Sequence, residues 1–366
     1  MSWLYRTLAR PLLFSQESEA VHNRTLALLA AASRIGLARD LVAAICDVPD
    51  LPVRTLGLVF PNPIGLAGGM DKQGAAVPMW RAMGFGFSEL GGVTWEAQPG
   101  NPAPRMFRCE PDAALVNRMG FNNGGASALA VRLQEWRTAG LWPAHPVGIN
   151  LGKSKRTPLQ EAAGDYAASF RVLWGLADFF VVNVSSPNTP NLRQLQDRDA
   201  LNEILKALQL INLELAQGGS GKPLLVKVAP DLTLEALDEI AGLVEQRGIA
   251  GLVATNTTVT RPTMQDYQAQ RIYREAGGLS GRPLAGRSTE VIRHLYRQTR
   301  GRVPIIGVGG VFDAADAWEK VTAGATLVQT YTGLVYEGPG IAGAIVTGLI
   351  DRLGGARWEQ VVGCAA

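Results

Sequence analysis

Past Pro52, short runs of apolar residues alternate with longer segments in which apolar residues recur at helical spacing. Each run is continuous rather than alternating, which is typical of strands buried on both faces of a parallel sheet. Eight strand–helix units predict an α/β fold, a closed (β/α)₈ TIM barrel, with a doubly wound open sheet as the alternative. The eight runs are IGLAG from Ile64, SELGG from Ser88, VGINL from Val147, FFVVNV from Phe179, LLVKV from Leu224, GLVAT from Gly251, PIIGV from Pro304 and TLVQT from Thr326.

The N-terminal segment has a different pattern. Residues 1–14, MSWLYRTLARPLLF, combine aromatic and aliphatic side chains with two arginines, and helical spacing resumes over 20–37. Ser15 or Ser18 is the expected N-cap of this second helix, and Gly36 lies where it could end. These features predict a small two-helix extension over 1–40, followed by a barrel domain over 41–366.

This extension has neither the shape of a secretory signal nor the roughly 20 consecutive apolar residues of a spanning helix. The residues alone leave two interpretations open. The helices could form a hairpin packed on their own domain, as apolar stripes usually do. They could instead attach the protein to one face of a membrane through exposed aromatic and basic side chains.

Composition and charge limit the classes of function that the sequence supports. The net charge is +3, from 35 basic and 32 acidic residues without a lysine-rich run, so nucleic acid is not an indicated partner. The three cysteines show no CxxC spacing and none of the three histidines is spaced as a pair, so no metal site is predicted. A redox or acid/base site for an organic substrate fits better.

Polar residues gather where the predicted strands end, which is where barrels carry their active sites. Lys227 lies between two valines inside a strand, so its ammonium should point into the barrel and needs an anionic partner. Asparagine amides suit a planar ligand such as a pyrimidine or an isoalloxazine, although loop asparagines also form turns. The asparagines in question are Asn117, Asn150, Asn183, Asn188 and Asn256.

Two further signals are weaker. GVGG at 307–310 and YTG at 331–333 suit either a phosphate site or tight turns. Ser185 and Ser186 lie in no GxSxG turn and have no histidine nearby in sequence, so an activated serine nucleophile is not indicated. A general base and local capping both remain open for this pair.

Together these motifs closely resemble class 2 dihydroorotate dehydrogenase, over nearly the whole chain and in the family's order. The resemblance implies an FMN-containing (β/α)₈ barrel that oxidises (S)-dihydroorotate to orotate in de novo pyrimidine synthesis and passes electrons to a membrane quinone. The motifs are GLAGGMDKQG, TWEAQPGNPAPRMFR, NRMGFNNGG, GINLGKSK, NVSSPNTPNLRQLQ, VKVAPDL, ATNTT, GGLSGRPL, GVGG and VQTYTGLVYEGPG.

The resemblance also implies roles for individual residues. Ser186 matches the family's base, which takes the C5 proton of dihydroorotate while hydride leaves C6 for the flavin. The implied substrate-binding residues are Lys72, Asn117, Arg118, Met119, Gly120, Phe121, Asn183, Asn188, Asn256 and Thr257. The implied FMN-binding residues are Gly68, Gly69, Met70, Asp71, Lys72, Asn150, Asn183, Lys227, Thr255, Gly281, Gly310, Tyr331 and Thr332.

The class follows from Ser186, where class 1 enzymes place a cysteine, and from the N-terminal extension. The resemblance therefore implies a peripheral protein on the cytoplasmic side of the cell membrane, with ubiquinone or menaquinone as acceptor and no obligate protein partner. His22, Arg105 and Tyr331 match positions that line the quinone tunnel. Another FMN barrel with a soluble partner, and a phosphate-binding barrel without flavin, are the rival hypotheses.

Three departures from the family pattern stand out, and one of them, Trp95 in place of the usual proline, has no physical explanation in the sequence. GGVT replaces the usual GTVT, so Gly92 removes a hydroxyl expected near the flavin, which Thr94 or backbone N–H groups could replace. Asn191 replaces a common glycine, a mild change if this residue is left-handed, because asparagine tolerates that conformation.

Overall fold

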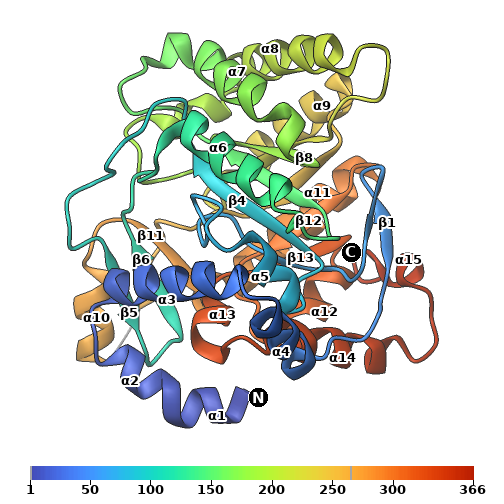
Figure 1. The fold of residues 1–366 in the computed structure, drawn as a ribbon. Helices are drawn as coiled ribbons and strands as arrows, with labels where there is room; N and C mark the ends of the chain where they lie inside the picture. Colours follow the sequence, from blue (N-terminus) through green and yellow to red (C-terminus); the bar gives the residue numbers. More distant parts are fainter. Residues whose placement is uncertain (1, 264–265) are drawn as a thin grey trace.

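A computed structural model describes residues 2–263 and 266–366. Its centre is a closed barrel of eight parallel strands in the order β3-β4-β7-β8-β9-β10-β12-β13, with β13 paired to β3 (Figure 1). All eight runs predicted from the sequence are barrel strands, so the closed barrel is confirmed and the open sheet is wrong. The strands are β3 (Ile64–Leu66), β4 (Phe87–Val93), β7 (Val147–Leu151), β8 (Phe179–Asn183), β9 (Leu224–Val228), β10 (Gly251–Ala254), β12 (Ile305–Val308) and β13 (Leu327–Thr330).

Helices follow the strands along the chain and cover the outside of the barrel, which is why the strands are apolar on both faces. They are α5 (Val77–Ala82), α6 (Gly125–Thr138), α7 (Ala162–Leu173), α8 (Arg198–Ala216), α9 (Leu234–Arg247), α11 (Ala285–Thr299), α12 (Ala314–Thr322) and α14 (Ile341–Leu353). Shorter helices are α10 (Tyr267–Tyr273), α13 (Thr332–Glu337), α15 (Trp358–Val361) and the 3₁₀ turns Leu159–Glu161, Trp174–Leu176, Leu192–Gln196 and Arg282–Leu284.

Aromatic rings packed against glycines fill the lower part of the barrel. A Cβ on Gly65 would lie 2.3 Å from the Phe87 ring, and one on Gly148 would lie 2.2 Å from the Phe179 ring. The two rings meet edge to face at 6.3 Å. Because side chains two residues apart on a strand share a face, the next inward residue above Phe87 is Glu89. The barrel interior thus changes from apolar to charged within one layer.

Two small antiparallel sheets lie outside the barrel. The hairpin of β1 (Val53–Thr55) and β2 (Leu58–Phe60) precedes β3. The other sheet combines β5 (Met106–Cys109), β6 (Ala114–Asn117) and β11 (Gly278–Gly281), in the order β11-β6-β5. These last strands are inserted after β4 and β10, so they bring residues such as Asn117 to the carboxyl ends of the barrel strands.

The N-terminal helices differ in detail from the prediction. The first runs through α1 (Ser2–Leu4), a π-helical turn (Tyr5–Ala9) and α2 (Arg10–Phe14), and the next is α3 (Ser18–Ser33). Neither Ser15 nor Ser18 caps α3, so this prediction is wrong. Glu17 caps α3 instead, since its carboxylate accepts from the N–H groups of Glu19 at 2.9 Å and Ala20 at 2.7 Å.

The expected end of this helix at Gly36 is also wrong. The helix ends at Ser33, and Gly36 begins a further helix, α4 (Gly36–Cys46), which continues past residue 40. Within the described residues, no helix combines the length and the apolar character needed to cross a membrane.

Candidate functional site

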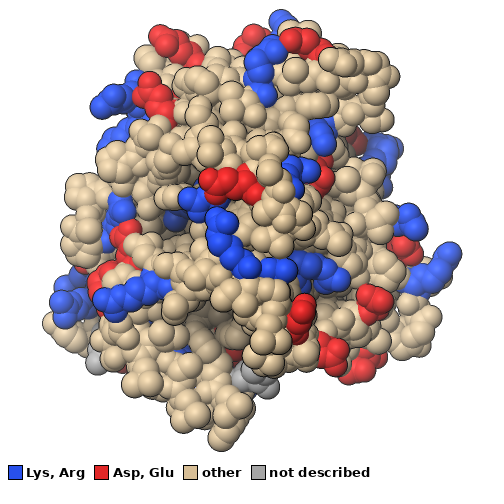
Figure 2. Space-filling model, in the orientation of Figure 1, with Lys and Arg blue, Asp and Glu red and all other residues tan. Residues whose placement is uncertain are grey.

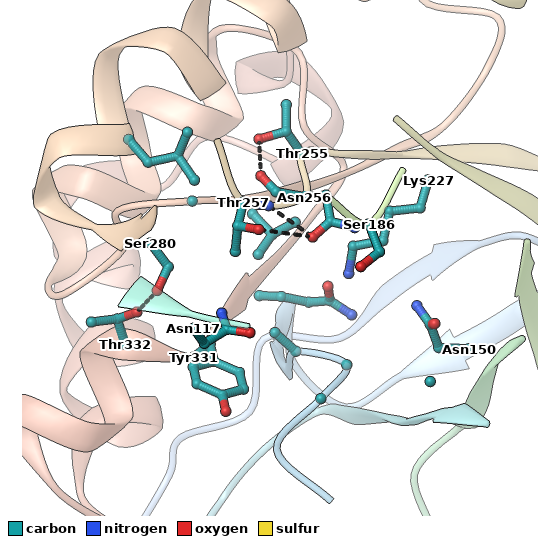
Figure 3. Close-up of a pocket in the computed structure, with 18 of the residues that line it drawn as sticks. Asn117, Asn150, Ser186, Lys227, Thr255, Asn256, Thr257, Ser280, Tyr331 and Thr332 are labelled. Carbon is teal, nitrogen blue, oxygen red and sulfur yellow. Dashed lines mark hydrogen bonds between the residues drawn. The ribbon is translucent and has the colours of Figure 1, made fainter. Parts of the chain in front are cut away.

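A cavity opens at the carboxyl ends of the barrel strands and contains about 970 Å³ of empty space, counting its open mouth. Figure 3 shows Ser186, Asn256 and Lys227 grouped in one part of it and Tyr331 in another. Most of the residues predicted from the sequence border this cavity. They are Gly68, Gly69, Lys72, Asn117, Met119, Gly120, Phe121, Asn150, Asn183, Ser186, Asn188, Lys227, Thr255, Asn256, Thr257, Gly281, Gly310, Tyr331 and Thr332.

Three predicted residues use their side chains elsewhere. Asp71 is fully buried and accepts from the N–H groups of Ala75 and Ala76 and from the Trp80 indole, so it fixes the start of α5. Arg118 pairs with Glu275 at 2.6 Å. Met70 borders a second, apolar cavity. Each of the three lies next in sequence to a residue that borders the first cavity.

The two serines after β8 have different surroundings. The Ser185 hydroxyl is fully buried, donates to Asn183 Oδ1 at 3.1 Å and accepts from Asn256 Nδ2 at 3.0 Å. Ser186 borders the cavity, and within the described structure its Oγ accepts a single long bond of 3.3 Å, from the Asn188 N–H. Ser185 therefore holds neighbouring amides, whereas the Ser186 hydroxyl is available to a ligand.

A chain of amides crosses the cavity wall. Asn256 Nδ2 donates to Asn183 Oδ1 at 3.2 Å, Asn183 Nδ2 to Asn150 Oδ1 at 2.9 Å, and Asn150 Nδ2 to Glu89 Oε1 at 2.6 Å. Because the carboxylate can only accept, it fixes which end of each amide points which way. The asparagines are thus oriented before any ligand binds.

Glu89 also provides the anionic partner that the Lys227 ammonium needs. Lys227 Nζ lies 3.2 Å from Glu89 Oε1, and both side chains are buried. Gln329 Nε2 donates to the other oxygen, Glu89 Oε2, at 2.8 Å. Neither Glu89 nor Gln329 is among the residues predicted from the sequence. The signal for Glu89 is the one that identified Lys227, a charged residue inside an apolar strand.

Two buried amide oxygens at this cavity, Asn188 Oδ1 and Gln329 Oε1, accept no hydrogen bond from the residues that the structure describes. Such atoms are costly to bury unless a ligand donates to them. Near Gln329, the wall has no room for a side chain at Gly68, since a Cβ there would fall 2.3 Å from Glu89 Oε1. A planar ring with N–H donors and an electron-rich edge near Lys227, such as a flavin, fits these groups.

Lys72 brings a second positive charge to the cavity. Burial lowers its pKa to about 8, and Arg105 lowers it too, while Glu19 and Asp71 act in the opposite direction. Glu19 comes from α3 and forms a salt bridge of 2.6 Å with Arg105. The N-terminal helices therefore contribute charge to the edge of the site.

The second cavity lies between the N-terminal helices and the barrel, and contains about 1230 Å³ of empty space, counting its mouth. Figure 2 shows the surface hollowed between α3 and the almost uncharged tip that residues 2–14 form. Apolar side chains such as Phe14, Leu29 and Ile45 dominate its wall. A long apolar ligand fits this cavity.

Two of the three predicted tunnel residues, His22 and Tyr331, border this apolar cavity. Burial, with Lys72 nearby, lowers the pKa of His22 to about 3, so its ring is neutral at physiological pH. Tyr331 also borders the first cavity and so lies between the two. Arg105 does not border the apolar cavity; besides Glu19, it donates to the carbonyls of Pro99 and Asn101.

The departures from the family pattern at Gly92 and Asn191 each have a local explanation. A Cβ on Gly92 would lie 2.5 Å from the Phe121 ring, so this ring fills the space that a larger residue would need. Thr94 does not replace the missing hydroxyl, since its Oγ1 donates to Glu96 O and accepts from Asn123. Asn191 has φ 58° and ψ 2°, which confirms the left-handed conformation.

Comparison with known proteins adds family membership to this geometry. A family model described as dihydroorotate dehydrogenase matches residues 50–353. A curated protein from Gloeobacter violaceus, named dihydroorotate dehydrogenase (quinone), is 51% identical over 99% of both chains. A protein of the same name from Synechococcus elongatus is 50% identical over 99% of this chain and 98% of that protein. Another, from a Cyanothece species, is 55% identical over 83% of this chain and 80% of that protein.

The fold is also similar to solved structures. A crystal structure of DHODH from Eimeria tenella in complex with ferulenol superposes with a TM-score of 0.81 at 36% identity, covering 90% of this chain and 95% of that one. The ligand-free type from the same organism gives a TM-score of 0.80 at 36% identity, over 90% and 98% of the two chains.

Proposed function

We propose, from the premise that this chain belongs to the dihydroorotate dehydrogenase family, that it oxidises (S)-dihydroorotate to orotate in pyrimidine synthesis. The proposed cofactor is FMN, and the proposed final acceptor is a membrane quinone. One observation carries the proposal: an available hydroxyl, Ser186, shares a cavity with oriented amides and with the buried ammonium of Lys227.

Several residues would hold FMN. Lys227 and Gln329 would contact its ring, and Gly310 and Thr332, which lie where barrels commonly bind phosphate, would hold its phosphate. When bound, FMN would accept hydride from C6 of the substrate and later pass the two electrons on to quinone. The protein itself supplies binding, orientation and proton transfer.

Ser186 would take the proton from C5 of dihydroorotate. A hydroxyl is a weak base, so this role needs an acidified substrate and a largely dry site. Ser186 is 7% exposed and sits among buried amides. The Lys72 ammonium would bind the substrate carboxylate, and the amides of Asn117, Asn188 and Asn256 would bind the ring.

The apolar cavity would admit the quinone. Two of its polar groups, His22 and Tyr331, would both be uncharged at physiological pH, since burial lowers the pKa of His22 to about 3 and raises that of Tyr331 to about 12. The exposed apolar side chains of the N-terminal helices would rest on the membrane, with the protein peripheral on the cytoplasmic side. Arg105 would not contact the quinone in this cavity, because its side chain is held by Glu19 and by the carbonyls of Pro99 and Asn101.

The proposed chemistry is tested by stopped-flow reduction of the bound flavin. We expect Ser186→Ala to slow flavin reduction by dihydroorotate at least about 10²-fold, the usual scale for loss of a general base. Substrate affinity should change little, because Ser186 is not assigned a binding contact.

Ser185→Ala is the matched control, since it removes a hydroxyl one residue away. It should leave the reduction rate within about threefold and weaken substrate binding instead, because Asn183 and Asn256 lose a shared partner. Equal rates in wild type and Ser186→Ala would assign proton transfer elsewhere. Purified protein without a yellow chromophore would rule out the flavin hypotheses together.

A further inference from the structure

Glu89 is a fully buried carboxylate that does not border the cavity itself. It links three side chains that do border the cavity and that form what we call the cavity floor. It comes from β4 and binds one side chain from each of β7, β9 and β13: Asn150, Lys227 and Gln329. All three of these partners do border the cavity. A ligand bound on this floor would therefore contact three side chains whose positions are determined by the Glu89 carboxylate.

The carboxylate also determines which atoms the floor presents. Both Glu89 oxygens accept and neither donates, so the Gln329 amide must turn its NH₂ group toward Glu89. Its Oε1 then points away, and this buried oxygen has no partner among the described residues. The floor thus presents an ammonium, on Lys227, and a free acceptor, on Gln329.

We propose that Glu89 is a positioning residue of the flavin site: it holds the Lys227 ammonium and turns the Gln329 carbonyl oxygen toward the N3–H edge of the bound isoalloxazine ring. This inference rests on the proposed function, because it assumes that a flavin occupies the cavity. Glu89 touches neither flavin nor substrate, and acts only through its three partners.

Its negative charge has a second effect. Reduced flavin gains negative charge near N1, which Lys227 stabilises and which a carboxylate behind Lys227 opposes. The Glu89–Lys227 pair is neutral overall. Glu89 therefore prevents the floor from stabilising the reduced flavin as strongly as a lone ammonium would, and electron transfer onward to an acceptor stays favourable.

The decisive variant is Glu89→Gln, which keeps the shape and removes the charge. Its new NH₂ group would face Gln329, the partner of Oε2, so the Gln329 amide must turn round and present its own NH₂ to the cavity. We expect the midpoint potential of the bound flavin to become more positive, its visible spectrum to shift, and its release to be faster than from wild type. An unchanged or lower potential overturns the proposal, whatever the melting temperature.

Asp165→Asn is the matched control. Asp165 is also buried, accepts from the Ser154 N–H and the Thr157 hydroxyl, and does not border the cavity. This variant should lower the melting temperature while leaving the flavin potential and spectrum as in wild type. A flavin shift of the same size in Asp165→Asn would mean that Glu89→Gln reports general loosening, which also overturns the proposal.

A third measurement needs no variant, so it decides the question even if Glu89→Gln fails to fold. Wild-type protein stripped of flavin is reconstituted with FMN or with N3-methyl-FMN, which lacks the N3–H donor. We expect the analogue to bind at least about tenfold more weakly, the scale of one lost hydrogen bond. Equal affinities overturn the assigned orientation of Gln329. Wild type that binds no flavin at all refutes the proposed function instead.

Discussion

At the scale of single residues, side chains of the same type have different roles because their surroundings differ. Ser185 and Ser186 are adjacent, but only the second borders the cavity. Lys72 and Lys227 both border it, yet only Lys227 has a carboxylate within salt-bridge distance in the described structure. The Lys72 ammonium therefore remains available to pair with a ligand, and because its pKa is lowered, the pH dependence of ligand binding can be measured.

The Lys72 ammonium gives a pH prediction. Its pKa is about 8 in the folded protein against an ordinary value of 10.5, so the ammonium is lost as pH rises through about 8. Binding of the substrate carboxylate requires the charged form, so dihydroorotate affinity should fall about tenfold per pH unit above this value. The dissociation constant measured by stopped flow from about pH 6 to about pH 9.5 checks this.

Lys72→Arg is the control, because a guanidinium stays charged over that range. Its affinity should be nearly independent of pH, whatever its absolute value. A slope that persists in Lys72→Arg would assign the titration to another group. The same shift predicts that Lys72 makes folding stability rise with pH between about 8 and 10.5, where the unfolded chain holds the extra proton.

At the scale of elements, the N-terminal helices carry an unusual share of exposed apolar side chains. Leu8 is 62% exposed and Leu12 is 70% exposed, on consecutive turns of the first helical segment. The proposed membrane contact would give these side chains an apolar surface against which to bury.

This proposal predicts the behaviour of charge variants. Leu8→Glu/Leu12→Glu should reduce co-sedimentation with vesicles of anionic and zwitterionic lipids by at least about tenfold, since each buried leucine contributes on the order of 2 kcal/mol. Flavin reduction by dihydroorotate should not change, because neither residue borders the first cavity.

Leu210→Glu/Leu213→Glu is the matched control on α8, where the two leucines are 62% and 71% exposed. These substitutions should leave vesicle binding unaltered. If both double variants bind vesicles as wild type does, the N-terminal helices are not the membrane contact.

At the scale of the whole molecule, two cavities of opposite character meet at Tyr331. One is formed by the barrel strands and their loops, and the other lies between the barrel and the N-terminal helices. A bound flavin beside Tyr331 would be accessible from both. Substrate and quinone then need not be present together.

Separate cavities predict ping-pong kinetics. Double-reciprocal plots of rate against dihydroorotate concentration, at several concentrations of a soluble quinone analogue, should give parallel lines. Intersecting lines would mean that both ligands must bind before either reacts. As a control, a small hydrophilic electron acceptor should give turnover that is insensitive to blocking of the apolar cavity.

Much of this protein could be predicted from its sequence. The eight strands, the barrel and most cavity residues follow from runs of apolar residues and from polar groups at strand ends, because hydrophobic burial and strand period act locally. The helix boundaries near Glu17 and Gly36 were less predictable, since several nearby residues can cap or end a helix. Family resemblance added the identities of substrate and cofactor.

Only the tertiary structure decided which side chains meet. Glu89 and Gln329 are 240 residues apart in sequence, and Glu89 and Lys227 are 138 apart, yet all three share one layer inside the barrel. Closure of the sheet and its register set these contacts, and no local pattern encodes either. The sequence by itself determined that a charged strand residue needs a partner; the closed barrel determined which partner, because only there do the facing strands come within hydrogen-bond distance.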